Sequence, residues 1–501
     1  MAKSNTAKSG RSFVVLIVCA VLVCALTAFV IADGMLHRSD FLRDQAFIGA
    51  LSDAMDSFPA QITEEDLAEV KVLFLNGRFS QGMIFDGFEL TLGFEDAAQY
   101  MRNLQEYGED FEDENFEDYF LFASSEISIR DFSNLAYFPN LEFLHITAMP
   151  NMRDVSFLEN MTSLDTVSIQ LVGTNDFSPL SGNTSIQRLT VGAVELDSVD
   201  AFASLTALEF LMLSGTGISD VSGLANLTNL TTLSLDSNDI EDITYLRNLT
   251  ALEQLSLSGN NITDISPIAG LTSLETLNLN QNNITGVSAL SSLVNLETLG
   301  LIGNAELSDI SGLGGLANLT ELHISGTQVS DISPLANLPS IETLVLDNND
   351  IDDVSPIASL LSLETLTLDN NNIEDISPLA SLTNLELLAL EGNRIEDISA
   401  LAPLSDGALT FLSLANNSIS DISVLAAFEN LEILVLDNNI IEDFSALDVL
   451  EEGGTFVSGR NSQFGDIFSF DDWDFDDLED EGYGYDDYDY YSNDYETDED
   501  E

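Results

Sequence analysis

The chain has 501 residues, of which 45% are hydrophobic, and its 86 acidic and 14 basic residues give a formal net charge of −72. This apolar content is enough to bury a core over most of the chain, which excludes a mainly disordered protein. So acidic a surface repels nucleic acid and anionic lipid head groups, which excludes nucleic-acid binding and favours basic partners, divalent cations or simple solubility.

Residues 1–32 have the composition of an export segment. Three basic residues precede an uncharged, almost entirely apolar run of twenty residues from Phe13 to Ala32, which is long enough to cross a bilayer as a helix. Two interpretations are open: an uncleaved N-terminal membrane anchor, and a signal peptide cleaved after Ala32. Both predict an exported protein, secreted or held at the cell surface, that meets the membrane only through this segment. Both cysteines, Cys19 and Cys24, lie inside it, so the rest of the chain cannot form disulfides.

Residues 33–118 are predicted to form a helical cap or stalk before the repeats that follow. The stretch from Met35 to Ser57 places apolar residues at near-helical spacing. Thr63-Glu-Glu-Asp66 has the pattern of a capping box, and it predicts a second helix that runs to Val72.

Residues 119–450 repeat one 22-residue pattern about fifteen times. The clearest copy begins at Leu252 and reads L-x-x-L-x-L-x-x-N-x-I, which is the leucine-rich repeat. This pattern predicts an α/β repeat solenoid: a horseshoe with parallel strands on the concave face and short helical turns on the convex face. The copies begin at Tyr119, Leu141, Leu164, Ile186, Leu208, Leu230, Leu252, Leu274, Leu296, Leu319, Ile341, Leu363, Leu385, Leu409 and Leu431.

Two features of the repeat are interpreted as structural. Most copies carry an asparagine where the chain turns after the strand, and an inward amide there can pair with buried backbone groups. A following Asp-Ile/Val-Ser-Pro motif, as at Asp264 to Pro267, predicts a helical turn with Ser as N-cap and Pro at the first helical position. The asparagine column consists of Asn238, Asn260, Asn282, Asn304, Asn349, Asn371, Asn393, Asn417 and Asn439.

Strand alternation places the third, fifth and seventh residues of each copy on the concave face. Apolar residues, among them Leu387, gather there toward the two ends, and the middle is polar. Such residues either anchor a partner or merely cover the end repeats. The predicted partner-binding residues are Phe143, His145, Phe210, Met212, His323, Phe411, Ile433 and Val435.

Two columns of carboxylates recur through the repeats, one of Glu and one of Asp. Like charges stacked about 5 Å apart repel, and either bound cations or local turn hydrogen bonds from the Asp side chains would relieve this. The Glu column includes Glu253, Glu275 and Glu297, and the Asp column consists of Asp220, Asp242, Asp264, Asp309, Asp331, Asp353, Asp375, Asp397, Asp421 and Asp443.

Residues 451–470 are predicted to cap the C-terminal end, and residues 471–501 to form a disordered acidic, Tyr-rich tail. Seventeen of the thirty-one residues from Asp471 to Glu501 are Asp or Glu. Such a tail either keeps the chain soluble or binds cations or a basic partner. It lacks the spacing of an EF-hand loop, so any calcium binding is expected to be weak and diffuse.

The sequence predicts no catalytic residue, no cofactor and no metal site, and therefore not an enzyme. The three histidines, His37, His145 and His323, are far apart. No motif for a nucleophile, a zinc site or a phosphate-binding loop is present.

The 22-residue period, the asparagine column and the stretch Asp331 to Leu338, which reads D-I-S-P-L-A-N-L, resemble the internalin family of bacterial surface proteins. The resemblance covers residues 119–450, and it implies adhesion to a host protein through the concave face. The leading hypothesis is thus an extracellular, non-enzymatic binding module for a protein partner. The acidity of this chain would favour a basic partner. The alternative is a structural acidic cell-envelope protein that binds cations. The partner's identity and the oligomeric state stay open.

Overall fold

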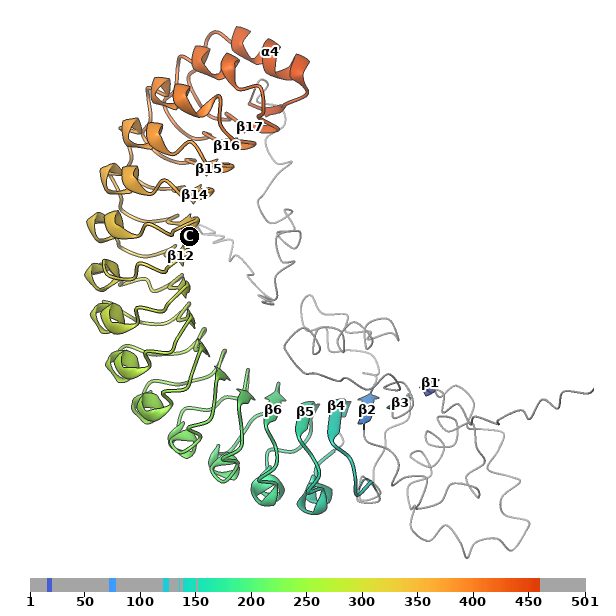
Figure 1. Ribbon diagram of the computed structural model, residues 1–501. Coiled ribbons are helices and arrows are strands. Elements are labelled where there is room, and N and C mark those ends of the chain that lie inside the picture. The colour runs from blue at the N-terminus through green and yellow to red at the C-terminus, as the bar shows by residue number, and fades with distance from the viewer. Residues whose placement is uncertain are drawn as a thin grey trace, which may run out of the picture.

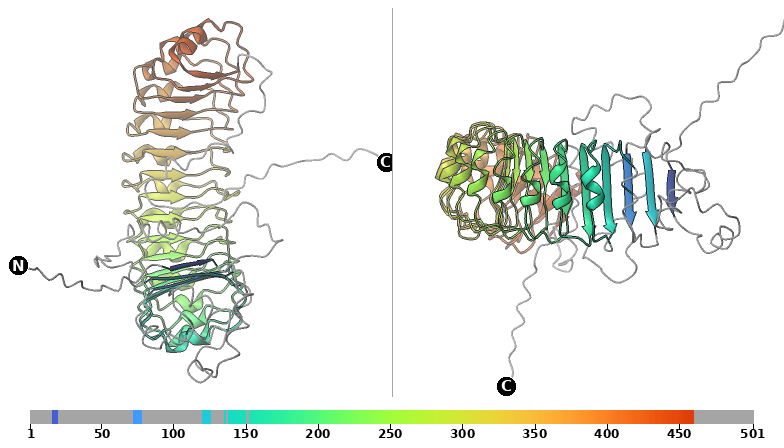
Figure 2. Two further views of the ribbon diagram at one scale, coloured as in Figure 1. Left: turned by 90° about the vertical axis from the view of Figure 1, so that its right-hand side faces the viewer. Right: turned by 90° about the horizontal axis from the view of Figure 1, so that it is seen from below.

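The structure is a computed structural model that describes residues 16–19, 72–77, 120–125, 135, 138–149 and 152–459. The repeats wind into an open, curved solenoid with strands along the inner side and short helices along the outer side (Figure 1), and the strands stack edge to edge (Figure 2). This confirms the predicted α/β horseshoe. Within the described residues, no helix has both the length and the apolar character needed to cross a membrane.

All described strands belong to one parallel sheet. Spatial neighbours follow the order β1-β3-β2-β4, and from β4 to β18 each strand pairs with the next along the chain. The strands are β1 (Leu16–Cys19), β2 (Val72–Gly77), β3 (Phe120–Ser125), β4 (Phe143–Met149), β5 (Thr166–Val172), β6 (Arg188–Gly192), β7 (Phe210–Met212), β8 (Thr232–Ser234), β9 (Gln254–Ser256), β10 (Thr276–Asn278), β11 (Thr298–Gly300), β12 (Glu321–His323), β13 (Thr343–Val345), β14 (Thr365–Thr367), β15 (Leu387–Ala389), β16 (Phe411–Ser413), β17 (Ile433–Val435) and β18 (Phe456–Ser458).

The convex side is built from short 3₁₀ helices, one per repeat, and ends in one α-helix. A single turn suffices because each repeat has only a few residues to return the chain to the next strand. The helices are η4 (Ser156–Asn160), η5 (Ser178–Gly182), η6 (Asp200–Phe202), η7 (Ser222–Leu224), η8 (Thr244–Asn248), η9 (Ser266–Gly270), η10 (Ser288–Ser292), η11 (Ser311–Leu313), η12 (Ser333–Asn337), η13 (Ser355–Ser359), η14 (Ser377–Ser381), η15 (Ser399–Leu404), η16 (Ser423–Ala427) and α4 (Ser445–Gly453).

The N-terminal edge of the sheet differs from the prediction. Val72 begins strand β2, so the predicted second helix does not reach that residue. Strand β2 lies between β3 and β4, and its register aligns Leu73 with Leu144 and Leu75 with Ile146, the L-x-L pair of the first clear repeat. Of the predicted export segment, the described residues form strand β1, which pairs with β3. The rest of that segment and of the predicted cap lies outside the described residues.

The core is a continuous column of leucine and isoleucine that runs the length of the solenoid. In the clearest repeat, Leu252, Leu257 and Ile262 are fully buried, and burying one such side chain contributes roughly 1.5–3 kcal/mol. Each repeat alone has too little apolar surface to fold, so the repeats stabilise one another by stacking.

The asparagine column links each repeat to the one before it, as predicted. The Nδ2 of Asn371 donates to the carbonyl of Leu346 in the preceding repeat at 2.9 Å and to that of Leu368 in its own repeat at 3.1 Å. Its Oδ1 accepts from the backbone N–H of Ile351 at 3.0 Å. The amide thus pairs the buried N–H of Ile351, and it shares the two carbonyls with Asn349 and Asn393 of the neighbouring repeats. Buried threonines, Thr216 and Thr327, occupy this position in two repeats.

The convex turns are capped by aspartate, and the prediction of Ser as N-cap was wrong. Ser266 is the first residue of η9, and its backbone N–H donates to Oδ1 of Asp264 at 2.8 Å. The same bond recurs along the solenoid, for example from Ser377 to Asp375 at 2.8 Å. Asp reaches this N–H because its carboxylate lies two residues upstream, as in an Asx turn. Local turn hydrogen bonds therefore account for the Asp column.

These hydrogen bonds make the convex turns sensitive to acid. The backbone N–H and the hydroxyl of Ser266 hold the pKa of Asp264 below its ordinary value. The bond therefore contributes fully above the ordinary Asp pKa, and it is lost as the pH falls through the lowered value. We expect Asp264→Ala to lower Tm by about 1–2 °C at neutral pH, with the difference closing in strong acid. Thermal melts of both chains across this pH range check it, and a constant difference would contradict it.

The C-terminal end is closed by α4 and β18. Helix α4 begins at Ser445, within the region predicted to be repeats, and buries Leu447 and Leu450. Strand β18 then pairs with β17. Closure of the last repeat therefore starts before residue 451. Residues 460–470 and the predicted tail lie outside the described residues.

Candidate binding surface

The strands present the third and fifth residues of each repeat on the concave face, as alternation predicts. In β10, Thr276 and Asn278 are partly exposed on either side of buried Leu277. Because all strands pair in parallel and in register, equivalent residues form straight columns across the face. The third-residue column consists mainly of Thr and polar residues in the middle repeats.

At the C-terminal end, this column becomes apolar over four successive strands. Register aligns Leu387 with Phe411, Phe411 with Ile433, and Ile433 with Phe456. The first three side chains and Val435 are partly exposed, and Phe456 is 52% exposed. These five residues are called the C-terminal patch. The sequence analysis placed Phe456 in the C-terminal cap and not on the concave sheet, because it follows a helix and lies outside the repeat pattern.

Carboxylates border the C-terminal patch on both sides. Glu386 and Glu432 directly precede the strands and are exposed. Glu391 and Asp437 follow the strands and are partly exposed, and Asp437 accepts a hydrogen bond from the hydroxyl of Ser458. The patch is therefore an apolar column between two acidic rows.

The predicted anchors at the N-terminal end separate into two groups. The guanidinium carbon of Arg188 lies 4.3 Å from the ring centroid of Phe210, a cation–π contact, and both Phe210 and Met212 are partly exposed. Phe143 and His145 are only 4% and 7% exposed. The prediction that they lie open on the concave surface was wrong, because both side chains are buried. Burial lowers the pKa of His145 to about 4, so it is neutral at pH 7.

His323 lies alone in the middle of the concave face. Its register neighbours are Gly300 and Val345, so the strand pairing does not bring it to either apolar end. Burial lowers the pKa of His323 below its ordinary value, which leaves it mainly neutral at pH 7.

A row of carboxylates crosses three successive repeats next to the strands. Oδ1 of Asp347 accepts from the N–H of Asp369 at 2.7 Å, and Oδ1 of Asp369 accepts from the N–H of Glu391 at 2.5 Å. Desolvation and the neighbouring charge of Asp347 raise the pKa of Asp369 to about 8, and desolvation also raises the pKa of Asp347. Among the described residues, no group of three or more His, Cys, Asp or Glu is arranged to hold a metal ion.

Comparison with known proteins supports a leucine-rich repeat protein similar to the internalins. The family described as Leucine Rich repeats (2 copies) matches residues 206–248, 228–270, 250–291, 272–315, 317–359, 361–403 and 408–449. A search of curated proteins gives no match. The crystal structure of an internalin from Listeria monocytogenes is 32% identical, with a TM-score of 0.51, over 62% of this chain and 84% of the internalin chain.

The chain belongs to the internalin-like leucine-rich repeat proteins. Two further solved structures share its fold at lower identity. A leucine-rich repeat protein of Leptospira interrogans is 20% identical, with a TM-score of 0.59, over 66% of this chain and 93% of that one. A chain of the Toll–Spatzle complex of Drosophila is 19% identical, with a TM-score of 0.52, over 64% of this chain and 50% of its own length.

The internalin-like repeats carry a second set of inter-repeat hydrogen bonds that the sequence analysis missed. It runs along the turn before each strand, where the residue ahead of the first leucine donates to a carbonyl of the preceding repeat. Nδ2 of Asn318 donates to the carbonyl of Val294 at 3.1 Å, and Nδ2 of Asn384 donates to that of Leu361 at 3.0 Å. The recurring Asn or Ser at this position was the available signal.

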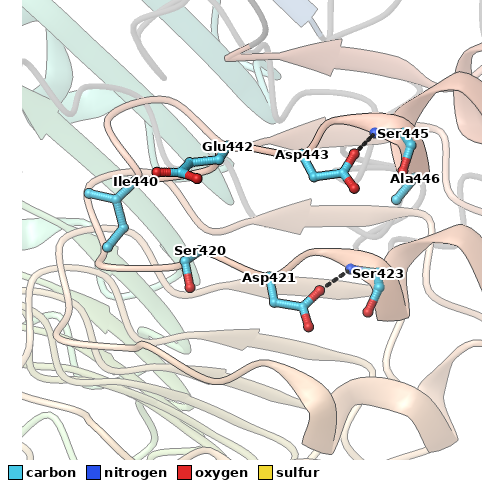
Figure 3. Close-up of a pocket in the computed structure, with 8 residues that line it drawn as sticks. All are labelled: Ser420, Asp421, Ser423, Ile440, Glu442, Asp443, Ser445 and Ala446. Carbon is cyan, nitrogen blue, oxygen red and sulfur yellow. Dashed lines mark hydrogen bonds between the residues drawn. The ribbon is translucent and has the colours of Figure 1, made fainter.

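A shallow hollow lies between the last two repeats of the internalin-like chain (Figure 3). Asp421 and Asp443 line it, but each carboxylate is turned toward a helix start, where it accepts from the N–H of Ser423 and Ser445 at 2.9 Å. Ile440 at its rim is 63% exposed. Because its aspartates already serve as caps, the hollow is a product of the repeat geometry.

Proposed function

We propose that this chain is an exported, non-enzymatic recognition module that binds a protein partner through its concave face. The observation that carries the proposal is the C-terminal patch, in which four of the five apolar side chains align on successive strands where most middle repeats carry Thr. Aligned, partly exposed aromatic and aliphatic residues are the usual anchors of protein interfaces. The 32% identity to a Listeria internalin supports a surface role.

Rigidity favours binding by this face. The strands are locked by backbone pairing and by the asparagine column, so the anchors lose little conformational entropy when a partner docks. The acidic rows beside the patch would attract a partner with basic residues around an apolar centre.

Replacing two anchors by the residue that neighbouring repeats use tests this proposal. We expect the double variant Phe411→Thr/Ile433→Thr to weaken partner binding by at least about tenfold. The assay is saturable binding of the labelled full-length chain to a panel of cell surfaces and envelope preparations, with and without calcium. Thr343→Ser/Thr365→Ser, in the same column, is the matched control. Equal binding by both variants, or no saturable binding, would refute the proposal.

One observation favours the alternative, a structural acidic cell-envelope protein that acts as a cation-binding spacer. It is the exposed Glu column that includes Glu253, Glu275 and Glu297. The Asp column no longer supports it, because those carboxylates accept turn hydrogen bonds. If calcium raised the Tm of the full-length chain while no saturable partner was found, the spacer would become the better account.

A further inference from the structure

An apolar stripe lies outside the concave face, on the turn that leads from the convex helices back to the strands. It consists of one residue from each of four successive repeats, all exposed: Val294, Ala317, Pro339 and Leu361. The two largest side chains, Val294 and Leu361, are 52% and 57% exposed. These four residues are called the lateral stripe. They add nothing to the core, whose leucines lie immediately beside them in the chain.

The other repeats provide an internal reference for this position, two residues before the first leucine. In the six preceding repeats it is threonine without interruption, and threonine returns in the repeat directly after the stripe. The turn therefore accommodates a polar residue without difficulty, and the four apolar residues depart from the chain's own pattern as one block. The threonines are Thr162, Thr184, Thr206, Thr228, Thr250, Thr272 and Thr383.

Hydrogen bonds from side chains of the following repeat hold the backbone at three of the four stripe residues. The carbonyl of Val294 accepts from Nδ2 of Asn318, that of Pro339 from the hydroxyl of Ser362 at 3.1 Å, and that of Leu361 from Nδ2 of Asn384. Successive stripe residues thus stand one repeat apart. That spacing is about 5 Å at the strands, and it widens slightly toward the outside of the curve (Figure 1).

The charge next to the stripe is entirely negative. Glu297, Glu342 and Glu364 each follow a stripe residue by three positions and are exposed. Three residues span at most about 11 Å, so these carboxylates lie within reach of a partner seated on the stripe. The sequence contains no Lys or Arg between Arg247 and Arg394, so this part of the solenoid offers no competing cation.

We propose that the lateral stripe is a second binding surface, and that its occupant is an amphipathic helix of a partner protein with Lys or Arg along one flank. Residues on one face of a helix, three or four apart, have Cβ atoms about 5–6 Å apart, which matches the repeat spacing. Apolar residues of the helix would pack on the stripe while its basic flank faces the Glu column. A second copy of this chain is a poor occupant, because a net charge of −72 on each copy makes them repel.

The test uses a synthetic helical peptide with a leucine face and a lysine flank, titrated into the full-length chain by fluorescence anisotropy. A peptide of the same composition with scrambled order separates helix recognition from attraction by charge alone. We expect saturable binding of the amphipathic peptide that weakens as salt rises, and at least about tenfold weaker binding of the scrambled one.

Returning the stripe to the chain's own pattern completes the test. Val294→Thr/Leu361→Thr should weaken peptide binding at least about tenfold with an unchanged Tm, because both positions are exposed and threonine occupies them elsewhere. In a chain that already carries Phe411→Thr/Ile433→Thr, the two stripe substitutions should still weaken peptide binding at least about tenfold, which separates this surface from the C-terminal patch. Failure of the peptide to bind, equal binding of the scrambled peptide, or unchanged binding by the stripe variant would each overturn the proposal.

Discussion

Replacing Asn371 with alanine is expected to lower the free energy of unfolding by about 3–5 kcal/mol. The amide of Asn371 donates to the carbonyls of Leu346 and Leu368 and accepts from the N–H of Ile351. Alanine would leave the buried N–H of Ile351 without its partner, which costs about 1–3 kcal/mol. It would also remove one of two donors from the carbonyls of Leu346 and Leu368, which keep the amides of Asn349 and Asn393, at about 0.5–1.5 kcal/mol for each lost bond. The sum is less than additive because the repeats can relax locally.

Urea unfolding followed by circular dichroism measures this effect. Asn384→Ala is the matched control, because it removes a single hydrogen bond from an exposed amide, and its cost should stay below about 1 kcal/mol. Asn371→Thr should fall between the two, since threonine fills the same position at Thr216 and Thr327. A loss for Asn371→Ala no larger than that of the control would show that the column is dispensable.

Replacing Asp369 with asparagine is expected to stabilise the protein in alkaline solution by roughly 3–5 kcal/mol. Burial and the nearby charge of Asp347 raise the pKa of Asp369 from 3.8 to about 8. The folded state therefore holds a proton that the unfolded state releases between these two values. The native chain loses stability as the pH rises through this window, by up to about 1.4 kcal/mol per pH unit.

Asparagine removes this titration and keeps the acceptor. Asn280 shows that the amide fits. Its Oδ1 accepts from the N–H of Ile302 at 2.8 Å, in the same way that Oδ1 of Asp369 accepts from the N–H of Glu391. Urea midpoints at pH 5, 7 and 9 should diverge between the two chains as pH rises. Asp375→Asn, on the exposed convex side, is the control and should give no alkaline gain. Parallel pH profiles for Asp369→Asn and the native chain would contradict the prediction.

The repeat pattern alone predicted the fold, because its period fixes which residues are buried. The buried leucines at the first, fourth and sixth positions and the hydrogen-bonding asparagine column follow from this period, and the structure shows both. The concave columns follow only in part, because Phe143, His145 and the seventh-position Asn280 are buried. The solenoid's ends were less predictable, because they depart from the period. Strand β2 pairs with β4 across a long stretch of chain, and Phe456 reaches the concave sheet from outside the repeats.

Local capping was predicted in the right place but with the wrong residue. Both Asp264 and Ser266 are good N-caps by type, and only the geometry shows that the serine already has helical backbone and donates its N–H to the aspartate. The exposure of Phe143 and His145 was also predicted wrongly, because strand alternation gives the face on which a side chain lies and not whether other residues cover it. The lateral stripe required an exposure value, because an apolar residue beside a core leucine would be expected to be buried.

The absence of Lys and Arg between Arg247 and Arg394 also determines how the protein responds to proteolysis. Trypsin cuts after these two residue types, so it has no site from residue 248 to residue 393 even when those repeats are unfolded. After complete digestion, residues 248–394 would stay together as one long fragment that contains the lateral stripe and Asp369. Protection from trypsin therefore measures the opening of the repeats up to Arg247 and from Arg394 onward, and a protease that cleaves after leucine or phenylalanine is needed to follow the repeats between them.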